Sequence, residues 1–154
     1  MPLEHLEHFL VQTADLAATR DWYVRVLGMR EGPHPDFQFP VVWLYLGDTD
    51  VLHLTEGGAG SSPQRRSYLG QQSDAVYGSG VVDHVAFRCS GLPQTMERLR
   101  LEGVDFSQRQ VDDQGLYQLF LIDPNGLKIE LNFPAREADE HGIRPERSAA
   151  GLRS

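Results

Sequence analysis

The feature that most constrains the fold of this chain is an internal repeat. Two halves each read as a strand, a helix and three further strands, in the same order. His8 in the first strand corresponds to His84 at an offset of 76 positions, and His53 in the last strand corresponds to Glu130 at an offset of 77. This duplication predicts an α+β protein built from two βαβββ modules.

Local signals bound the predicted elements of the first half. A period of two among apolar residues predicts the first strand. Asp15 and Gly28 then predict the start and the end of a helix over residues 16–27. Two β-rich runs, residues 41–46 and 51–54, flank a Gly/Asp turn and predict a hairpin.

The second half repeats this order around an Asp-Pro-Asn-Gly turn signal. A helix is predicted over residues 90–102, and strands are predicted over residues 81–88, 104–111, 117–122 and 127–133.

We interpret residues 1–134 as a single domain with a seam in the middle. Module one covers residues 5–55 and module two covers residues 81–134. The Gly/Ser-rich stretch 56–80 is too long for an ordinary turn, so we expect a linker there. Residues 135–154 are charged and interrupted by Pro and Gly, which predicts a mobile tail.

Composition excludes several classes of function. The formal net charge is −8 and the pI is about 5.1, which disfavours nucleic acid or an anionic membrane surface as a partner. A single cysteine, Cys89, excludes an internal disulfide framework and a cysteine zinc cage. There is neither an apolar run of 18 residues nor a secretory signal, so we expect no membrane span and a cytoplasmic location.

The repeat places four potential metal ligands at matching positions: His8, His53, His84 and Glu130. Alternate residues of a half-buried strand face opposite sides, so these side chains should lie opposite the face that packs on the helices. If the two halves pair by two-fold symmetry, all four reach one concave surface. Imidazole and carboxylate suit Fe(II) or Mn(II), and also Zn(II), Ni(II) or Co(II).

Each of these residues also has a structural interpretation. A lone His8 or His84 could be a satisfied structural histidine, His53 could line a pocket, and Glu130 could be an outward surface carboxylate. The matched spacing favours metal binding over these readings. The remaining histidines fall outside the repeat and are expected on the surface: His5, His34 and His141.

The sequence also suggests roles for other side chains near the predicted centre. Arg88 shares a strand face with His84, so it either meets an anionic group of a substrate or forms a salt bridge at the rim. Cys89 has the parity of the core residues, which predicts a buried, unreactive thiol. Four aromatic residues either line a pocket or belong to the core: Trp43, Tyr45, Tyr117 and Phe120.

The sequence resembles the vicinal oxygen chelate superfamily, which includes glyoxalase I, methylmalonyl-CoA epimerase, extradiol dioxygenases, and the fosfomycin and bleomycin resistance proteins. The resemblance covers residues 5 to about 134. It is carried by four segments: residues 7–11, 22–29, 83–87 and 123–131.

This resemblance implies that two βαβββ modules pair into an open, U-shaped barrel of mixed sheets around one divalent metal ion. It implies His8, His84 and Glu130 as ligands, with His53 at a position where glyoxalase-like members place a carboxylate. It further implies an enzyme whose small substrate binds through two adjacent oxygens, and we expect a homodimer.

Two reactions compete within the resemblance. An extradiol dioxygenase usually carries a Tyr four residues before the Pro of the last turn, where this chain has Phe120, and Tyr117 faces the other way. A glyoxalase or epimerase needs a base, so Glu130 would be both ligand and base, unless a loop group such as Glu56 assists.

We favour dioxygenase chemistry, with Glu130 and Arg88 as catalytic groups; the lyase or isomerase is the alternative. A further alternative is a metal-free drug-binding resistance protein.

Overall fold

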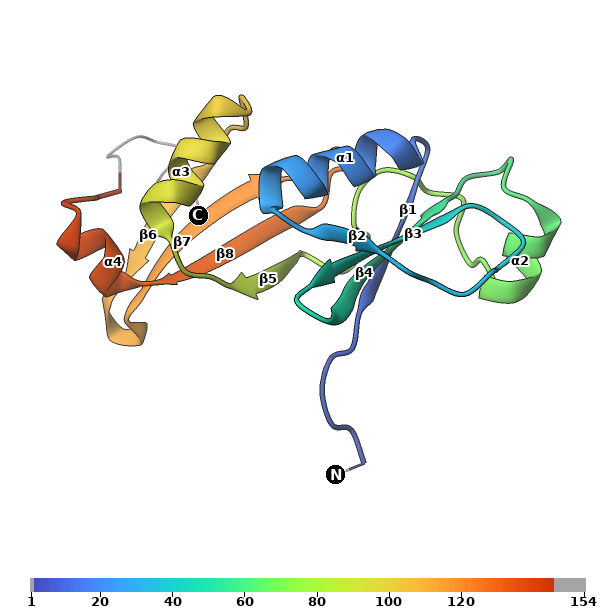
Figure 1. Ribbon diagram of the computed structural model, residues 1–154, viewed down its shortest axis with the longest axis horizontal. Coiled ribbons are helices and arrows are strands. Elements are labelled where there is room, and N and C mark those ends of the chain that lie inside the picture. The colour runs from blue at the N-terminus through green and yellow to red at the C-terminus, as the bar shows by residue number, and fades with distance from the viewer. Residues whose placement is uncertain (1, 146–154) are drawn as a thin grey trace. The chain divides into compact units, whose positions relative to one another are not determined.

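The computed structural model describes residues 2–145, which divide into two compact units between Gly78 and Ser79. The first unit contains a four-stranded sheet of order β1-β4-β3-β2, in which β1 and β4 run parallel and the other pairs are antiparallel (Figure 1). Its elements are β1 (Phe9–Thr13), α1 (Leu16–Leu27), β2 (Arg30–Gly32), β3 (Val41–Leu46), β4 (Thr49–Glu56) and α2 (Pro63–Leu69).

The second unit repeats this plan with strand order β5-β8-β7-β6 and a parallel pair β5/β8. The predicted α+β class and the two βαβββ modules are therefore confirmed. No helix within residues 2–145 has the length and apolar character needed to cross a membrane. The elements are β5 (His84–Arg88), α3 (Leu92–Leu101), β6 (Ser107–Val111), the 3-10 turn η1 (Asp112–Gln114), β7 (Leu116–Ile122), β8 (Lys128–Pro134) and α4 (Ala135–Glu140).

Helix α1 has the bounds that the sequence predicts. The Asp15 carboxylate accepts a hydrogen bond from the Ala18 N–H at 3.0 Å, which satisfies one of the free donors of the first turn. Gly28 ends the helix at a φ of 71°, which a residue with a Cβ adopts at a cost. The helix packs Tyr23 and Val26, both at most 2% exposed, against the sheet of the first module.

The parallel pairing has the same register in both modules. Leu10 is paired with His53 in the first module, and Ala86 is paired with Glu130 in the second. His8 and His84 each stand two positions before these partners, so in each module the histidine and its counterpart share one side of the sheet. We call this side, which is opposite the apolar helix-packed side, the site face.

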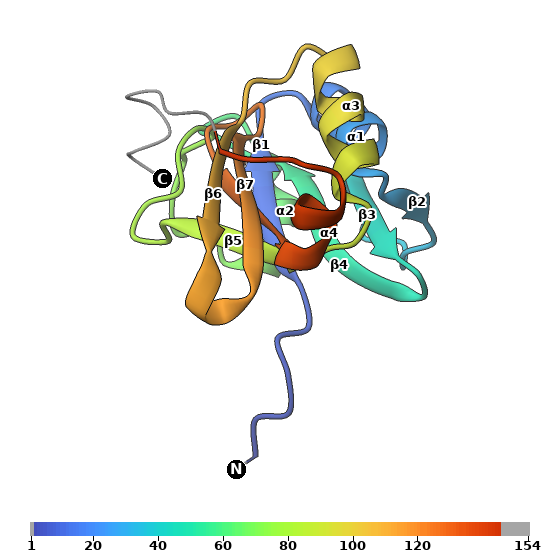
Figure 2. The ribbon, with the colours of Figure 1, turned by 90° about the vertical axis from the view of Figure 1, so that its left-hand side faces the viewer.

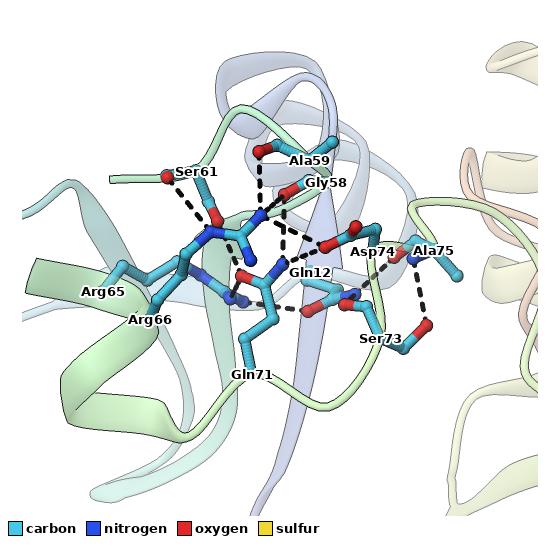
Figure 3. A network of polar contacts seen from close by, with 10 residues as sticks. All are labelled: Gln12, Gly58, Ala59, Ser61, Arg65, Arg66, Gln71, Ser73, Asp74 and Ala75. Carbon is cyan, nitrogen blue, oxygen red and sulfur yellow. Dashed lines mark hydrogen bonds and ion pairs between the residues drawn. The ribbon is translucent and has the colours of Figure 1, made fainter. Parts of the chain in front are cut away.

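Most of the stretch predicted as a linker, residues 56–78, belongs to the first unit. It contains helix α2, begun by the Ser62 hydroxyl, which accepts a hydrogen bond from the Arg65 N–H. Arg65 donates to Thr55 and Gln12 of the sheet. Arg66 donates to residues of the stretch itself, so hydrogen bonds hold the segment together and tie it to the sheet (Figure 3). The boundary between the two units falls near the end of the predicted linker, and the part before it is ordered by side-chain ties that single-sequence signals do not reveal.

The predicted tail also begins with ordered structure. Helix α4 lies against the second sheet, where Ala138 is fully buried (Figure 2). The Glu137 carboxylate accepts hydrogen bonds from the N–H groups of Gly91 at 3.2 Å and Leu92 at 2.6 Å, and so caps α3, which has no side-chain cap of its own. The first part of the predicted tail, residues 135–140, therefore forms a packed helix, and residues 146–154 lie outside the described part.

We predict that Glu137→Gln lowers the free energy of unfolding by about 1–2 kcal/mol, because an amide cannot accept from both N–H groups at the start of α3. Chemical denaturation monitored by circular dichroism measures this change. Glu140→Gln, an exposed change on the same helix, is the matched control and should have little effect. Equal midpoints for the two variants would contradict the capping role.

Candidate metal centre

The first module brings two of the predicted ligands together. The rings of His8 and His53 stack with their centroids 3.8 Å apart and an angle of 17° between their planes. Trp43 stacks on the other face of His53 at 3.9 Å and 6°. His53 is only 8% exposed, so the ring is fixed between two planar neighbours at the edge of the site face.

A carboxylate that sequence reasoning missed completes this cluster. The Asp50 carboxylate accepts a hydrogen bond from His53 Nε2 at 2.6 Å, and donor atoms of His8, Asp50 and His53 lie within 4.8 Å of one another. Burial lowers the pKa of His53 although Asp50 raises it, and the hydrogen bond from His53 lowers the pKa of Asp50. A neutral imidazole is the form that binds a metal ion.

The second module brings together the other two predicted ligands. His84 Nε2 lies 3.0 Å from Glu130 Oε2. Glu130 is 8% exposed, so the alternative reading of a surface carboxylate is wrong. Its position is the counterpart of His53 in the repeated register.

A chain of hydrogen bonds between side chains of the second sheet orients Glu130. Gln118 donates through Nε2 to Glu130 Oε1 at 2.8 Å and to Asn132 Oδ1 at 2.9 Å. Arg109 Nε donates to Gln118 Oε1 at 2.7 Å, which fixes the direction of the amide. Such outer partners hold a ligand in place before a metal ion binds.

The residue before each strand histidine also acts on the ring. Glu7 accepts a hydrogen bond from His8 Nδ1 at 3.0 Å, and Asp83 accepts one from His84 Nδ1 at 2.7 Å. Lys128 lies 2.7 Å from Asp83, and its hydrogen bond to Asp83 is the main reason why the pKa of that carboxyl is lowered. In both modules, therefore, Nδ1 is held by a carboxylate and Nε2 is left for another partner.

The residues present fit a divalent metal ion. His84 Nδ1 contacts Asp83, and its Nε2 lies 3.0 Å from Glu130 Oε2. In the tautomer that donates from Nδ1, Nε2 and the carboxylate oxygen are both acceptors. A cation satisfies both groups. Two atoms bound at right angles to one ion with bonds of about 2.1 Å also lie about 3 Å apart. Neutral imidazoles and carboxylates suit first-row divalent ions.

A cavity of about 370 Å³ adjoins the histidine pair within the first module. The polar groups along it include Glu7, His8, His53 and Thr55. Its aromatic walls are Phe37, Phe39, Trp43 and Tyr68, whose rings are in mutual contact; Phe37 lies 5.3 Å from Tyr68 and 6.0 Å from Trp43. Aromatic lining with few polar groups is typical of small-molecule sites.

The four aromatic residues that the sequence assigns either to a pocket or to the core have different positions in the structure. Trp43 lines the cavity, whereas Tyr117 is fully buried on the helix-packed side and belongs to the core. Tyr45 lies under Arg30 and donates its hydroxyl to the Pro33 carbonyl. Phe120 is paired with Glu130, and the Arg109 guanidinium lies 5.1 Å from its ring.

The structure also locates the remaining candidates. Arg88 is exposed and paired with Asn132, on the side of the sheet that carries His84. The three histidines outside the repeat are exposed, as predicted: His5, His34 and His141.

We predict that the Cys89 thiol is unreactive in the folded protein. Burial raises its pKa to about 11, so the thiolate fraction at pH 8 falls by about two orders of magnitude relative to a free cysteine. Labelling with a thiol-reactive disulfide at pH 8 should be slow in buffer and fast in denaturant. Rapid stoichiometric labelling of the native protein would refute this.

Comparison with known proteins identifies the family of the chain. No protein with curated annotation matches the chain. A solved structure from the mobile metagenome of V. Pseudocholerae is 21% identical, with 86% of this chain and 96% of that chain covered and a TM-score of 0.64. The antibiotic-binding protein TnmS3 from Streptomyces sp. CB03234 is 20% identical, with 87% and 98% covered and a TM-score of 0.61. The fosfomycin resistance protein FosX from Listeria monocytogenes is 14% identical, with 88% and 97% covered and a TM-score of 0.61.

At these identities the likeness shows the fold. The family model for the Glyoxalase/Bleomycin resistance protein/Dioxygenase superfamily matches residues 5–131, most of the chain. The chain therefore belongs to the Glyoxalase/Bleomycin resistance protein/Dioxygenase superfamily.

Proposed function

We propose that this protein is a divalent-metal-dependent enzyme that binds a small substrate through two adjacent oxygens. Its metal ligands are His8, His53, His84 and Glu130. The observation that carries the proposal is the repeated register: each module presents one ligand pair on its site face, at equivalent positions of its parallel strands.

The proposed centre needs both modules, because each pair supplies only two of the four ligands. Pairing of the modules into an open barrel, within one chain or between the chains of a homodimer, would complete it. Three imidazoles and one carboxylate leave an octahedral ion two further positions for a chelating substrate. When bound, the ion, for which Fe(II) or Mn(II) is favoured, supplies Lewis-acid stabilisation of negative charge that develops on the substrate oxygens.

The chain's own residues have distinct roles in this proposal. Glu130 is buried and accepts a hydrogen bond from Gln118, so its main role in this proposal is that of a metal ligand rather than that of a base. Arg88 offers a cation to an anionic substrate group. The aromatic cavity next to His53 receives the apolar body of the substrate and excludes water from it.

We favour a dioxygenase-like oxidoreductase, since an imidazole-rich site with one Glu suits oxygen chemistry at Fe(II) and needs no protein base on carbon. The flat aromatic walls of the cavity support a ring-shaped substrate such as a catechol.

One observation favours the alternative, a glyoxalase- or epimerase-type lyase or isomerase. That reaction needs a base. Asp50, whose carboxylate lies 2.6 Å from His53, is a second candidate for this base besides Glu130. The further alternative, a drug-binding protein without metal, is supported by the cavity alone and leaves the two ligand pairs without a role.

We predict that His84→Ala and Glu130→Ala each abolish stoichiometric metal binding, because each removes one ligand and leaves the other of its pair alone. Metal content after loading with Fe(II) under anaerobic conditions, measured by elemental analysis, gives the result. His141→Ala changes an exposed histidine and is the matched control.

In the same experiment His53→Gln should keep metal at altered affinity, since an amide oxygen still coordinates. Full metal occupancy in His84→Ala and Glu130→Ala would overturn the ligand assignment.

The reaction itself is tested by anaerobic titration of the Fe(II) form with catechols, followed by oxygen. We expect a change in catecholate absorption on binding and oxygen uptake on mixing. If neither occurs across a broad panel of catechols, the dioxygenase proposal is wrong, and α-hydroxycarbonyl substrates for the lyase or isomerase are the next to be assayed.

A further inference from the structure

Next to the cavity of the first module, Arg65 is a buried cation without an anionic partner among residues 2–145. Arg65 is 3% exposed, yet its side chain donates only to uncharged oxygens. These are the Thr55 hydroxyl and the side-chain amides of Gln12 and Gln71, which Figure 3 shows. Burying a guanidinium is costly unless its donors are satisfied, and these oxygens serve that purpose.

Both amides are fixed in the orientation that points their oxygens at Arg65. Gln12 donates through Nε2 to the carbonyls of Ser73, at 2.9 Å, and of Ala75. Gln71 donates through Nε2 to the Gly58 carbonyl at 3.0 Å and to Asp74 at 2.7 Å. Since the donor ends are occupied, neither amide can turn over, and Arg65 remains a donor to both oxygens.

This arrangement determines what the Thr55 hydroxyl can do. Thr55 Oγ1 accepts from Arg65 twice, from Nε at 3.2 Å and from Nη2 at 2.7 Å. A hydroxyl has two acceptor lone pairs and one proton, so both acceptor positions are used and the proton is left to donate. Hydrogen bonds from a charged donor polarise the O–H and strengthen it as a donor in turn.

The hydroxyl proton of Thr55 has no acceptor among residues 2–145, although the side chain is 2% exposed. Thr55 lines the aromatic cavity, two positions along β4 from His53 and therefore on the same side of the sheet. A ligand oxygen in the cavity is the acceptor that this buried donor lacks.

We propose that Thr55 is a specificity-determining residue that donates its hydroxyl proton to an acceptor oxygen of a ring-sized, largely apolar ligand held by Trp43 and its aromatic neighbours. The inference rests on the proposed function, because it assumes that the body of the substrate binds in this cavity. It names the substrate class more closely: an aromatic ring that carries a carbonyl or phenolate oxygen.

The test uses two ligands of nearly the same shape with the full-length, metal-free protein. Acetophenone carries a carbonyl oxygen, and α-methylstyrene replaces it by a methylene group. Two-dimensional ¹⁵N–¹H NMR titration follows the indole N–H signals of the two tryptophans. Trp43 lines the cavity and Trp22 is on α1, so Trp22 is the internal control.

Wild-type protein should bind acetophenone about fivefold more tightly than α-methylstyrene, which corresponds to about 1 kcal/mol for one hydrogen bond. Thr55→Val keeps the shape and removes the donor, so the preference should disappear. Thr55→Ser keeps the donor and should retain it. If Thr55→Val does not give a native spectrum, Thr55→Ala replaces it.

A preference that survives in Thr55→Val, or the absence of any shift of the Trp43 signal with either ligand, would overturn the inference. Because no metal is present, these outcomes are independent of metal stoichiometry in the ligand variants. If the titration fails but metal binding behaves as predicted, only the role of Thr55 is wrong. If the predictions on metal binding fail, the proposed metal-dependent enzyme is wrong.

Discussion

The parallel pairing of the first and last strands within each module is the constraint on which the candidate centre depends. Strands that are 43 or 44 residues apart in the sequence lie side by side, as the pairs Phe9–Leu52 and His84–Lys128 show. A shift of the register by one residue would turn His53 or Glu130 to the helix-packed side. The buried leucines and isoleucine next to them, Leu52, Leu54, Ile129 and Leu131, oppose such a shift, because it would expose them.

The same pairing explains why polar groups can be buried at the site face without loss of order. Each of the three candidate histidines gives one ring nitrogen to a carboxylate, and Glu130 receives the amide of Gln118. Each buried side-chain nitrogen or oxygen within residues 2–145 takes part in at least one hydrogen bond, as donor or as acceptor. The site is therefore organised by the protein before a ligand arrives, which reduces the cost of binding.

Much of the fold could be predicted because its signals are local. Asp15 and Gly28 mark the ends of α1, and the repeat offsets match the registers of both sheets. The family resemblance over residues 5 to about 134 is confirmed by the family model over residues 5–131. The structure also brings together His8 with His53 and His84 with Glu130, four residues that the repeat places at matching positions.

The features that were missed depend on contacts between distant side chains. By strand parity Asp50 belongs to the opposite side of β4, yet its carboxylate reaches His53 near the hairpin turn. Phe37, Phe39 and Tyr68 come from an irregular segment and a short helix, and no period in the sequence assigns them to a cavity. Helix α4 is stabilised by its contact with α3 through Glu137, 45 residues from Leu92 in sequence.

We propose that one ion is held by ligands of both modules. X-ray absorption spectroscopy at the K-edge of protein loaded with one equivalent of Zn(II) or Co(II) tests it most directly, because multiple scattering counts the imidazoles around the ion. We expect one ion per chain with three imidazoles and one carboxylate around it. An ion with two imidazoles and one carboxylate, which His8, Asp50 and His53 alone could supply, would contradict it.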